Sequence, residues 1–242
     1  MAPKGKNGPF WALAGMEKSH GKTGKKPRKR YCDFLSFNMH FKSVQCILTA
    51  LKYESEPIID HYGLARDKTF DFPVFRSGSM VLLGIGVGKK FIKTRICELY
   101  AQKQGDEEYQ FVNIGIAGGN PANTALGGCY MVNKIYDERD KIYYYPDLPA
   151  GHPFQEREVV TVEQGIINGG SEYAELVDME ASGIFQVCRA LVPEQRLVFI
   201  KIVSDHMDLN KVEFKKNIIS KLISNNMNTI DSFLKYCYFE EY

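Results

Sequence analysis

The stretch from 177 to 208, VDMEASGIFQVCRALVPEQRLVFIKIVSDHMD, constrains the fold most, because it predicts a helix followed by a buried strand. Apolar residues recur at helical spacing over 184–191. The run Leu197–Val203 is apolar except for one lysine, which is typical of a strand covered on both faces. In open α/β sheets a ligand lies beyond the carboxyl ends of the strands. Ser204 and Asp205 follow this strand, so we expect them to face a small molecule.

The acidic residues at both ends of this stretch also have a structural interpretation. Asp178 and Glu180 would favour a helix N-terminus through the helix dipole. Ser204 or Asp205 would cap the segment that follows. Spacing alone does not separate this interpretation from the functional one, and both stay open at this point.

The rest of the chain alternates expected strands and helices, which is typical of an α/β layer fold. With 242 residues and 44% apolar composition, one domain over residues 39–242 can bury a full core. We expect the segment 143–154 to be a loop over the cleft. The expected strands cover 43–50, 74–75, 80–85, 111–116, 130–136 and 158–162, and the expected helices cover 56–62, 89–102 and 212–237.

Composition narrows the class of protein further. No apolar run approaches the roughly 18 residues that span a bilayer, so no membrane partner is expected. The six cysteines include no CxxC pair, which favours a reduced, cytoplasmic setting. The five histidines are scattered and form no cluster with metal-ligand spacing. The sequence therefore predicts no metal and no cofactor.

The start of the chain differs from the remainder in charge. Residues 1–30 hold nine of the 31 basic residues and one of the 29 acidic residues, so the remainder is mildly acidic. Residues 1–38 are predicted to be a disordered tail, because they offer too little apolar surface to offset their ordering entropy. The run GKKPRKR at 24–30 leaves nuclear or organellar targeting open, although nucleic-acid binding is not expected. The tail could also be functionless, or could reflect a start codon upstream of Met39.

Five motifs occur in the order and approximate spacing of the purine nucleoside phosphorylase superfamily, and within it the chain most resembles the methylthioadenosine/S-adenosylhomocysteine nucleosidases. The resemblance implies a single α/β domain around a twisted, mostly parallel sheet that is partly closed into a barrel, flanked by helices and commonly dimeric. The implied activity is hydrolysis of the N-glycosidic bond of a 5′-substituted purine nucleoside to free base and sugar. The motifs are ALKYE at 50–54, GIGVGK at 84–89, NIGIAGG at 113–119, VDMEASG at 177–183 and IVSDHMD at 202–208.

The resemblance also implies roles for individual residues. Glu54 matches the acid that activates the attacking water, and Asp205 matches the acid that serves the purine. Met179 and Glu180 match residues that hold the ribose, with Glu180 accepting hydrogen bonds from its hydroxyls. Ser204 would support Asp205. Breaking the bond builds positive charge on the sugar and negative charge on the base, so a proton donor and a carboxylate both stabilise the transition state.

Two further segments match binding positions of that family. The main chain around Ile166 and Ile167 matches, within one residue, the segment that binds the base edge. Gly118 and Gly119 would line the sugar side, where glycine lets the backbone approach a ligand closely. These assignments complete the expected substrate-binding residues.

The chain departs from the nucleosidase pattern at several positions. Ile114 and Ile116 stand where those enzymes usually carry Thr and Ser, and the pair at 127–128 is Gly-Gly instead of Gly-Asp. The exact substrate, including its base and 5′ substituent, therefore stays open. A phosphate-dependent phosphorylase and a nucleoside-binding protein without turnover remain alternatives to the nucleosidase.

The sequence favours water over phosphate as the nucleophile. Phosphorylases of this superfamily hold phosphate with arginines near the first strand and before the glycine-rich turn, and neither location carries one here. Glu54 stands where it would repel a phosphate dianion. The remaining candidates for a phosphate ligand are Lys89, Arg76, or Arg66 of a second subunit.

Overall fold

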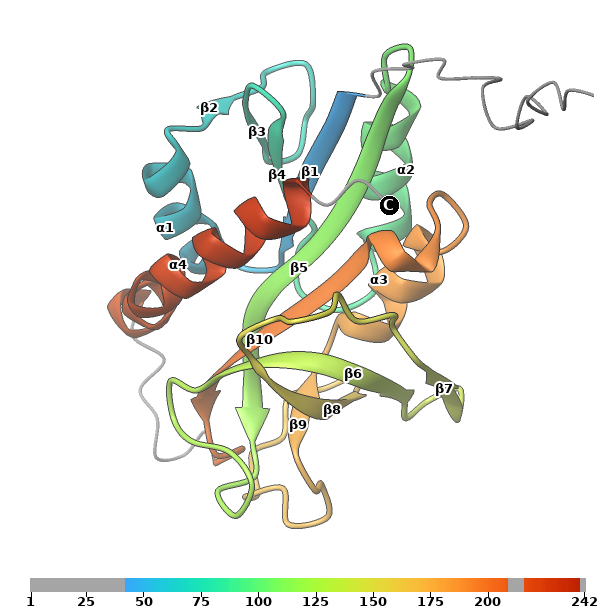
Figure 1. The fold of residues 1–242 in the computed structure, drawn as a ribbon. Coiled ribbons are helices and arrows are strands. Elements are labelled where there is room, and N and C mark those ends of the chain that lie inside the picture. The colour runs from blue at the N-terminus through green and yellow to red at the C-terminus, as the bar shows by residue number, and fades with distance from the viewer. Residues whose placement is uncertain (1–41, 209–215, 240–242) are drawn as a thin grey trace, which may run out of the picture. The chain divides into compact units, whose positions relative to one another are not determined.

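The computed structural model describes residues 42–208 and 216–239, and the predictions for residues 1–38 and for 212–215 lie outside this range. The centre of the domain is a parallel arrangement of four neighbouring strands (Figure 1). In spatial order these strands are β4 (Met80–Gly84), β1 (Lys42–Thr49), β5 (Glu107–Gly119) and β10 (Leu197–Asp205). Each is rich in buried aliphatic residues, as expected of strands covered on both faces.

The lower half of the sheet in Figure 1 closes into a barrel, because β10 pairs with β5 on one side and with β6 on the other. The ring runs β5, β10, β6, β8, β9 and back to β5. Its new members are β6 (Cys129–Asp137), β8 (Gln155–Thr161) and β9 (Leu176–Asp178), and shorter strands β2 (Ala65–Arg66), β3 (Val74–Ser77) and β7 (Ile142–Tyr144) extend the sheet. Parallel pairings dominate the centre and antiparallel pairings close the barrel and form the edges, so the sheet is mixed. The expected α/β fold with a partly closed sheet is confirmed.

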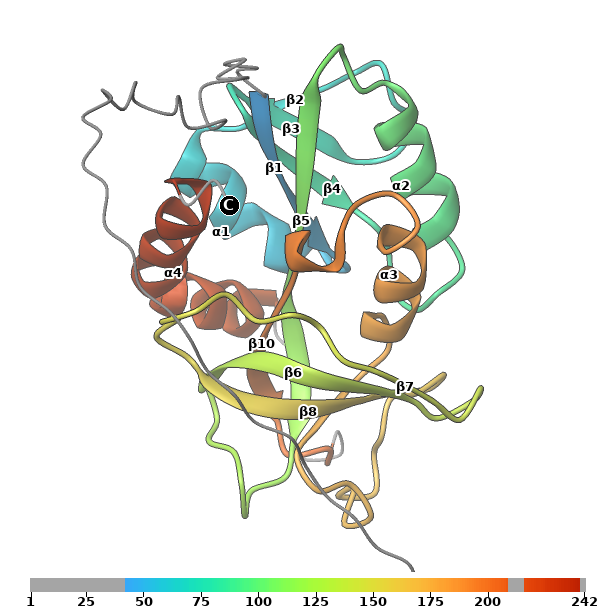
Figure 2. The same ribbon diagram turned by 45° about the vertical axis from the view of Figure 1, so that its right-hand side comes forward.

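Two pairs of helices cover the sheet, as the two views in Figures 1 and 2 show. Helices α1 (Lys52–Tyr62) and α4 (Lys216–Phe239) pack together, and α2 (Ile92–Ala101) packs with α3 (Ala181–Cys188). A short 3-10 turn η1 (Glu194–Arg196) leads into β10. Within the described residues, no helix is both long and apolar enough to cross a membrane.

Helix α1 begins one turn earlier than expected, at Lys52 instead of Glu56. The Glu54 side chain accepts hydrogen bonds from the backbone N–H groups of Ala50 and Leu51, which satisfies donors that a helix start leaves free. The prediction that the helix ends at Gly63 is confirmed, because Gly63 has a left-handed φ of 59°. Glu54 therefore belongs to the first turn of a helix and not to the end of a strand.

The segment 143–154 is also different from the prediction. Tyr144 belongs to β7 and packs against Phe185 of α3, with ring centroids 5.0 Å apart. Phe154 packs edge-on against Phe233 of α4, at 5.3 Å. Through Tyr144 and Phe154 the segment packs on helices, and it contributes no residue to the lining of the cavity described below.

Candidate functional site

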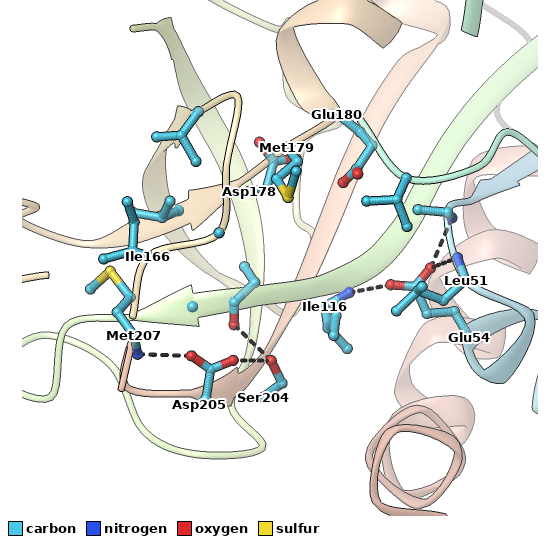
Figure 3. Close-up of a pocket in the computed structure, with 17 residues that line it drawn as sticks. Leu51, Glu54, Ile116, Ile166, Asp178, Met179, Glu180, Ser204, Asp205 and Met207 are labelled. Atoms are coloured by element: carbon cyan, nitrogen blue, oxygen red, sulfur yellow. Dashed lines mark hydrogen bonds between the residues drawn. The ribbon is translucent and has the colours of Figure 1, made fainter. Parts of the chain in front are cut away.

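A cavity of about 310 Å³ opens at the carboxyl ends of β1, β5, β8, β9 and β10. This volume lies at the lower end of the range typical of small-molecule sites. Figure 3 shows the side chains of β5, β9, β10 and the start of α1 converging on it. Its lining comprises the acids Glu54, Asp178, Glu180 and Asp205, the hydroxyl of Ser204, and the small or apolar residues Ala50, Leu51, Val87, Ile116, Ala117, Gly118, Val162, Gly165, Ile166, Val177, Met179 and Met207.

Glu54 lies at one end of this cavity and is 2% exposed. Its Oε1 accepts a hydrogen bond from the Ile116 N–H at 2.8 Å, while Oε2 accepts the Ala50 and Leu51 N–H groups at 2.8 Å each. A carboxylate has about four acceptor positions, so three backbone donors leave one for a ligand or water. Burial raises the pKa of Glu54, against the opposing effect of these hydrogen bonds and of the nearby Lys201 charge. The result is a fixed, desolvated carboxyl group.

Glu180 is the residue that precedes α3, and it lies at the same end of the cavity as Glu54 (Figure 3). Its Oε1 accepts a 2.7 Å hydrogen bond from the N–H of Gly88, in the loop between β4 and α2. Gly88 has a φ of 70°, a backbone conformation that glycine adopts without steric cost. Burial, followed by the charge of Asp178, raises the pKa of Glu180 to about 7. Glu180 is therefore a carboxyl group that titrates near neutral pH.

Asp205 is the last residue of β10 and lies at the opposite end of the cavity from Glu54. An irregularity in the pairing of β10 with β5 inserts Ser204 between two paired residues, and such bulges redirect the side chains beside them. The Ser204 hydroxyl donates to Asp205 Oδ2 at 2.6 Å, and the Met207 N–H donates to Oδ1 at 2.8 Å. Both oxygens of a buried carboxyl group are thus oriented by neighbours.

The structure adds a buried ion pair that the sequence analysis did not identify as part of the site. Lys201 Nζ lies 2.7 Å from Asp178 Oδ2, and both side chains are fully buried. Asp178 also accepts hydrogen bonds from the Thr161 hydroxyl at 2.7 Å and from the Ala181 N–H at 2.8 Å. Burial opposes the charge on Lys201, yet the carboxyl groups of Asp178, Glu180 and Glu54 keep its pKa raised. In the sequence, the single lysine in an otherwise apolar strand is the feature that indicates a buried charge needing a partner.

Two of the residues predicted to bind substrate do not line the cavity. Gly118 lines it but Gly119 does not, because a Cβ on Gly119 would meet Thr124 and Val203. Ile166 lines the cavity, whereas Ile167 is 53% exposed and lies outside it. The predicted roles of Gly119 and Ile167 concern their main chain, and they stay predictions. The other predicted site residues, Glu54, Met179, Glu180, Ser204 and Asp205, all line the cavity, while their roles stay predictions.

The basic side chains considered for phosphate binding lie elsewhere. Lys89 Nζ bonds Asp137 Oδ2 at 2.6 Å, and Arg76 Nε bonds Asp67 Oδ2 at 2.9 Å. Arg66 donates to backbone carbonyls, including that of Phe72 at 2.8 Å. Of the described residues, those lining the cavity include no lysine, arginine or histidine. Over the same ranges, no three His, Cys, Asp or Glu side chains are grouped so that they could hold a metal ion.

No family model and no curated protein matches this chain. Solved structures do match it over most of its length. A 5′-methylthioadenosine nucleosidase from Arabidopsis thaliana aligns with a TM-score of 0.66 at 16% identity, over 82% of this chain and 97% of that one. A Helicobacter pylori mutant nucleosidase with 5′-methylthioadenosine in its active site aligns at 0.65 and 13%, over 80% and 98%.

A third match is a methylthioadenosine/S-adenosylhomocysteine nucleosidase from Streptococcus pneumoniae bound to a transition-state inhibitor. It has a TM-score of 0.64 and 18% identity, over 79% of this chain and 98% of that one. At such identities the similarity establishes the fold. The expected resemblance to these nucleosidases is confirmed at that level.

Proposed function

We propose that this protein is a purine nucleosidase, which hydrolyses the N-glycosidic bond of a 5′-substituted purine nucleoside to free base and sugar. The observation that supports this most is the convergence of Glu54, Glu180 and Asp205 on one cavity from three different elements. The shared fold with enzymes that bind 5′-methylthioadenosine adds to it. The chain has the fold, the enclosed volume and the acidic groups that such a reaction needs.

In the proposed reaction Asp205 acts on the base. As the bond to the sugar breaks, negative charge develops on the purine, and a proton delivered at N7 stabilises it. The hydrogen bonds from Ser204 and from the Met207 amide fix the Asp205 carboxyl group for this transfer. A group held in place before the reaction avoids the cost of reorienting during it.

Glu54 and Glu180 serve the sugar and the water. Positive charge develops on the ribose, and Glu180 accepts hydrogen bonds from the ribose hydroxyls while its negative charge stabilises the cation. Glu54 uses its remaining acceptor position to hold water and takes a proton as that water attacks the anomeric carbon. The backbone donors on Glu54 keep its carboxyl group at one end of the cavity.

Charge at the cavity favours water over phosphate as the nucleophile. A phosphate dianion needs basic partners, and the described residues that form the walls offer carboxyl groups instead. Lys201, whose charge acts on Glu54 and Glu180, is already paired with Asp178. We therefore assign hydrolysis and not phosphorolysis.

The test is to incubate a panel of purine nucleosides with the protein in phosphate-free buffer and again with millimolar phosphate, and to identify the sugar product. Free base with free ribose derivative under both conditions is the expected result. Ribose 1-phosphate that appears only with phosphate would make the protein a phosphorylase and remove the water-activating role of Glu54. Tight nucleoside binding without release of base would indicate a binding protein.

The resemblance to this enzyme class also leads us to propose a cytoplasmic homodimer whose catalytic domain is residues 39–242. Light scattering on the purified chain tests the dimer, since a monomer at micromolar concentration contradicts it. Fractionation of cells that express the full chain tests the compartment.

A further inference from the structure

Met207 has a backbone conformation that is unusual for its residue type. Its φ is 60°, and within residues 42–208 and 216–239 only Lys141 is another non-glycine residue with positive φ. The side chain of Met207 is buried, with 1% exposure. Such strain persists only where the surrounding structure imposes it, and it is concentrated at functional sites.

Two backbone hydrogen bonds hold this conformation. The Met207 N–H donates to Asp205 Oδ1 at 2.8 Å, and the Met207 carbonyl accepts from the Gly169 N–H at 2.7 Å. The left-handed turn therefore directs the amide of Met207 at the carboxyl group of Asp205. It also fixes the start of the Met207 side chain next to that group.

The Met207 side chain lies between two glycines. A Cβ on Gly118 would come within 2.6 Å of Met207 Cγ, and a Cβ on Gly170 would collide with Met207 Sδ. Together with Ile166, the side chain forms the wall of the cavity beyond Asp205 (Figure 3). The absence of a side chain at both glycines therefore leaves the space that the Met207 side chain fills.

The proposed function gives this wall a position relative to the substrate. In the proposed reaction the sugar binds beside Glu54 and Glu180, and Figure 3 shows these two residues at the other end of the cavity from Met207. In a purine, N7 belongs to the ring joined to the sugar, and the substituent on C6 lies on the same edge but farther away. With N7 at Asp205, the C6 substituent therefore points at Met207.

We propose that Met207 determines base specificity, by closing the cavity against purine nucleosides that carry a bulky group on the exocyclic nitrogen at C6. The inference rests on the proposed function, since Asp205 must face N7. The limit concerns the size of the group on the nitrogen at C6, which the three acidic residues do not restrict. We expect an unsubstituted amino group at C6 to fit against this wall and a benzylamino group not to fit.

The test compares 5′-methylthioadenosine with its N6-benzyl derivative on the wild-type protein, Met207→Gly and Met207→Leu. Glycine adopts positive φ freely, so Met207→Gly removes the wall and keeps the turn. Leucine is of similar size, so Met207→Leu is the matched control. We expect wild-type kcat/KM to be at least about a hundredfold lower for the benzyl derivative, a gap that shrinks to about tenfold or less in Met207→Gly and persists in Met207→Leu.

Two results overturn the inference: equal use of both substrates by the wild-type protein, or a gap in Met207→Gly as large as in the wild type. Titration calorimetry with adenine and N6-benzyladenine measures binding without turnover. It therefore distinguishes a wrong size limit from a wrong hydrolase assignment. If no nucleoside is cleaved but Met207→Gly gains binding of N6-benzyladenine, the size limit holds and the hydrolase assignment fails. If neither variant nor wild type distinguishes the two bases, the size limit is wrong. Met207→Ala replaces Met207→Gly should the latter not fold.

Discussion

Replacing Lys201 by methionine is expected to destabilise the fold strongly, because it leaves the Asp178 carboxylate buried without its cation. Lys201 and Asp178 are both fully buried and lie 2.7 Å apart. Methionine keeps an unbranched side chain of similar length, so the change removes the charge more than the volume. Removing one partner of a buried ion pair typically costs about 3–5 kcal/mol.

Two hydrogen bonds to Asp178, from Thr161 and Ala181, remain in the variant and keep the loss within this range. For a domain of this size, about 2–4 °C of melting temperature is lost per kcal/mol, so a decrease of roughly 6–20 °C is expected. Thermal and urea unfolding followed by circular dichroism at pH 7 measure it. Lys201→Arg is the control that keeps the charge.

The double variant Asp178→Asn with Lys201→Met isolates the pair. A neutral amide needs no cation, so the double variant should recover much of the stability that Lys201→Met loses. If the two residues did not interact, the stability losses of the two single variants would simply add in the double variant. A melting temperature of Lys201→Met within about 2 °C of the wild type would refute the account of a dry, paired charge beneath the cavity.

Five other outcomes are expected, four at the site and one for the tail. Glu180→Gln and Asp205→Asn should each lower turnover at least about a hundredfold without lowering the melting temperature, as steady-state assays and calorimetry would reveal. With the pKa of Glu180 raised to about 7, kcat/KM should fall as pH drops through 7, and Glu180→Gln should lose this dependence. The folded state keeps Glu180 protonated to higher pH than the unfolded chain does. The free energy of unfolding should therefore fall as pH rises from about 4.5 to about 7. A urea midpoint that stays constant over this pH range would contradict the raised pKa. Gly118→Ala should cost about tenfold or more in turnover by displacing Met207, whose backbone N–H orients Asp205, and normal activity is the opposing result. Deletion of residues 1–38 should leave base release unchanged.

Much of the architecture could be predicted from the sequence, because hydrophobic periodicity decides it locally. The helix expected over 184–191, which is α3 at Ala181–Cys188, and the strand that follows placed Glu180 and Asp205 at element ends, and both residues line the cavity. The start of α1 could not be predicted in the same way. The Glu54 side chain caps that helix. This interaction depends on the backbone conformation of the residues that join β1 to α1.

A motif match does not predict which of two adjacent residues faces the cavity. Successive residues of a strand point to opposite faces, so Gly118 and Gly119 cannot both face one cavity. Ile166 and Ile167 lie in a segment without regular secondary structure, where Ile166 lines the cavity and Ile167 is 53% exposed. A motif match places such a segment but does not choose the face.

Long-range partners were the least predictable part of the site. Lys201 was visible as an exception in an apolar strand, but its partner Asp178 comes from a separate strand, β9. The left-handed backbone of Met207 has no signal in the sequence, because methionine rarely adopts it. Such features depend on the assembled barrel and not on local preference.

The proposed hydrolysis can be measured as the purine base released from 5′-methylthioadenosine in phosphate-free buffer by the wild-type protein and by Glu54→Gln, Glu180→Gln and Asp205→Asn. We expect one base per free sugar from the wild type, and a rate at least about a hundredfold lower in each folded variant. A wild-type protein that binds the nucleoside and releases no base, or variants that all keep the wild-type rate, would contradict it.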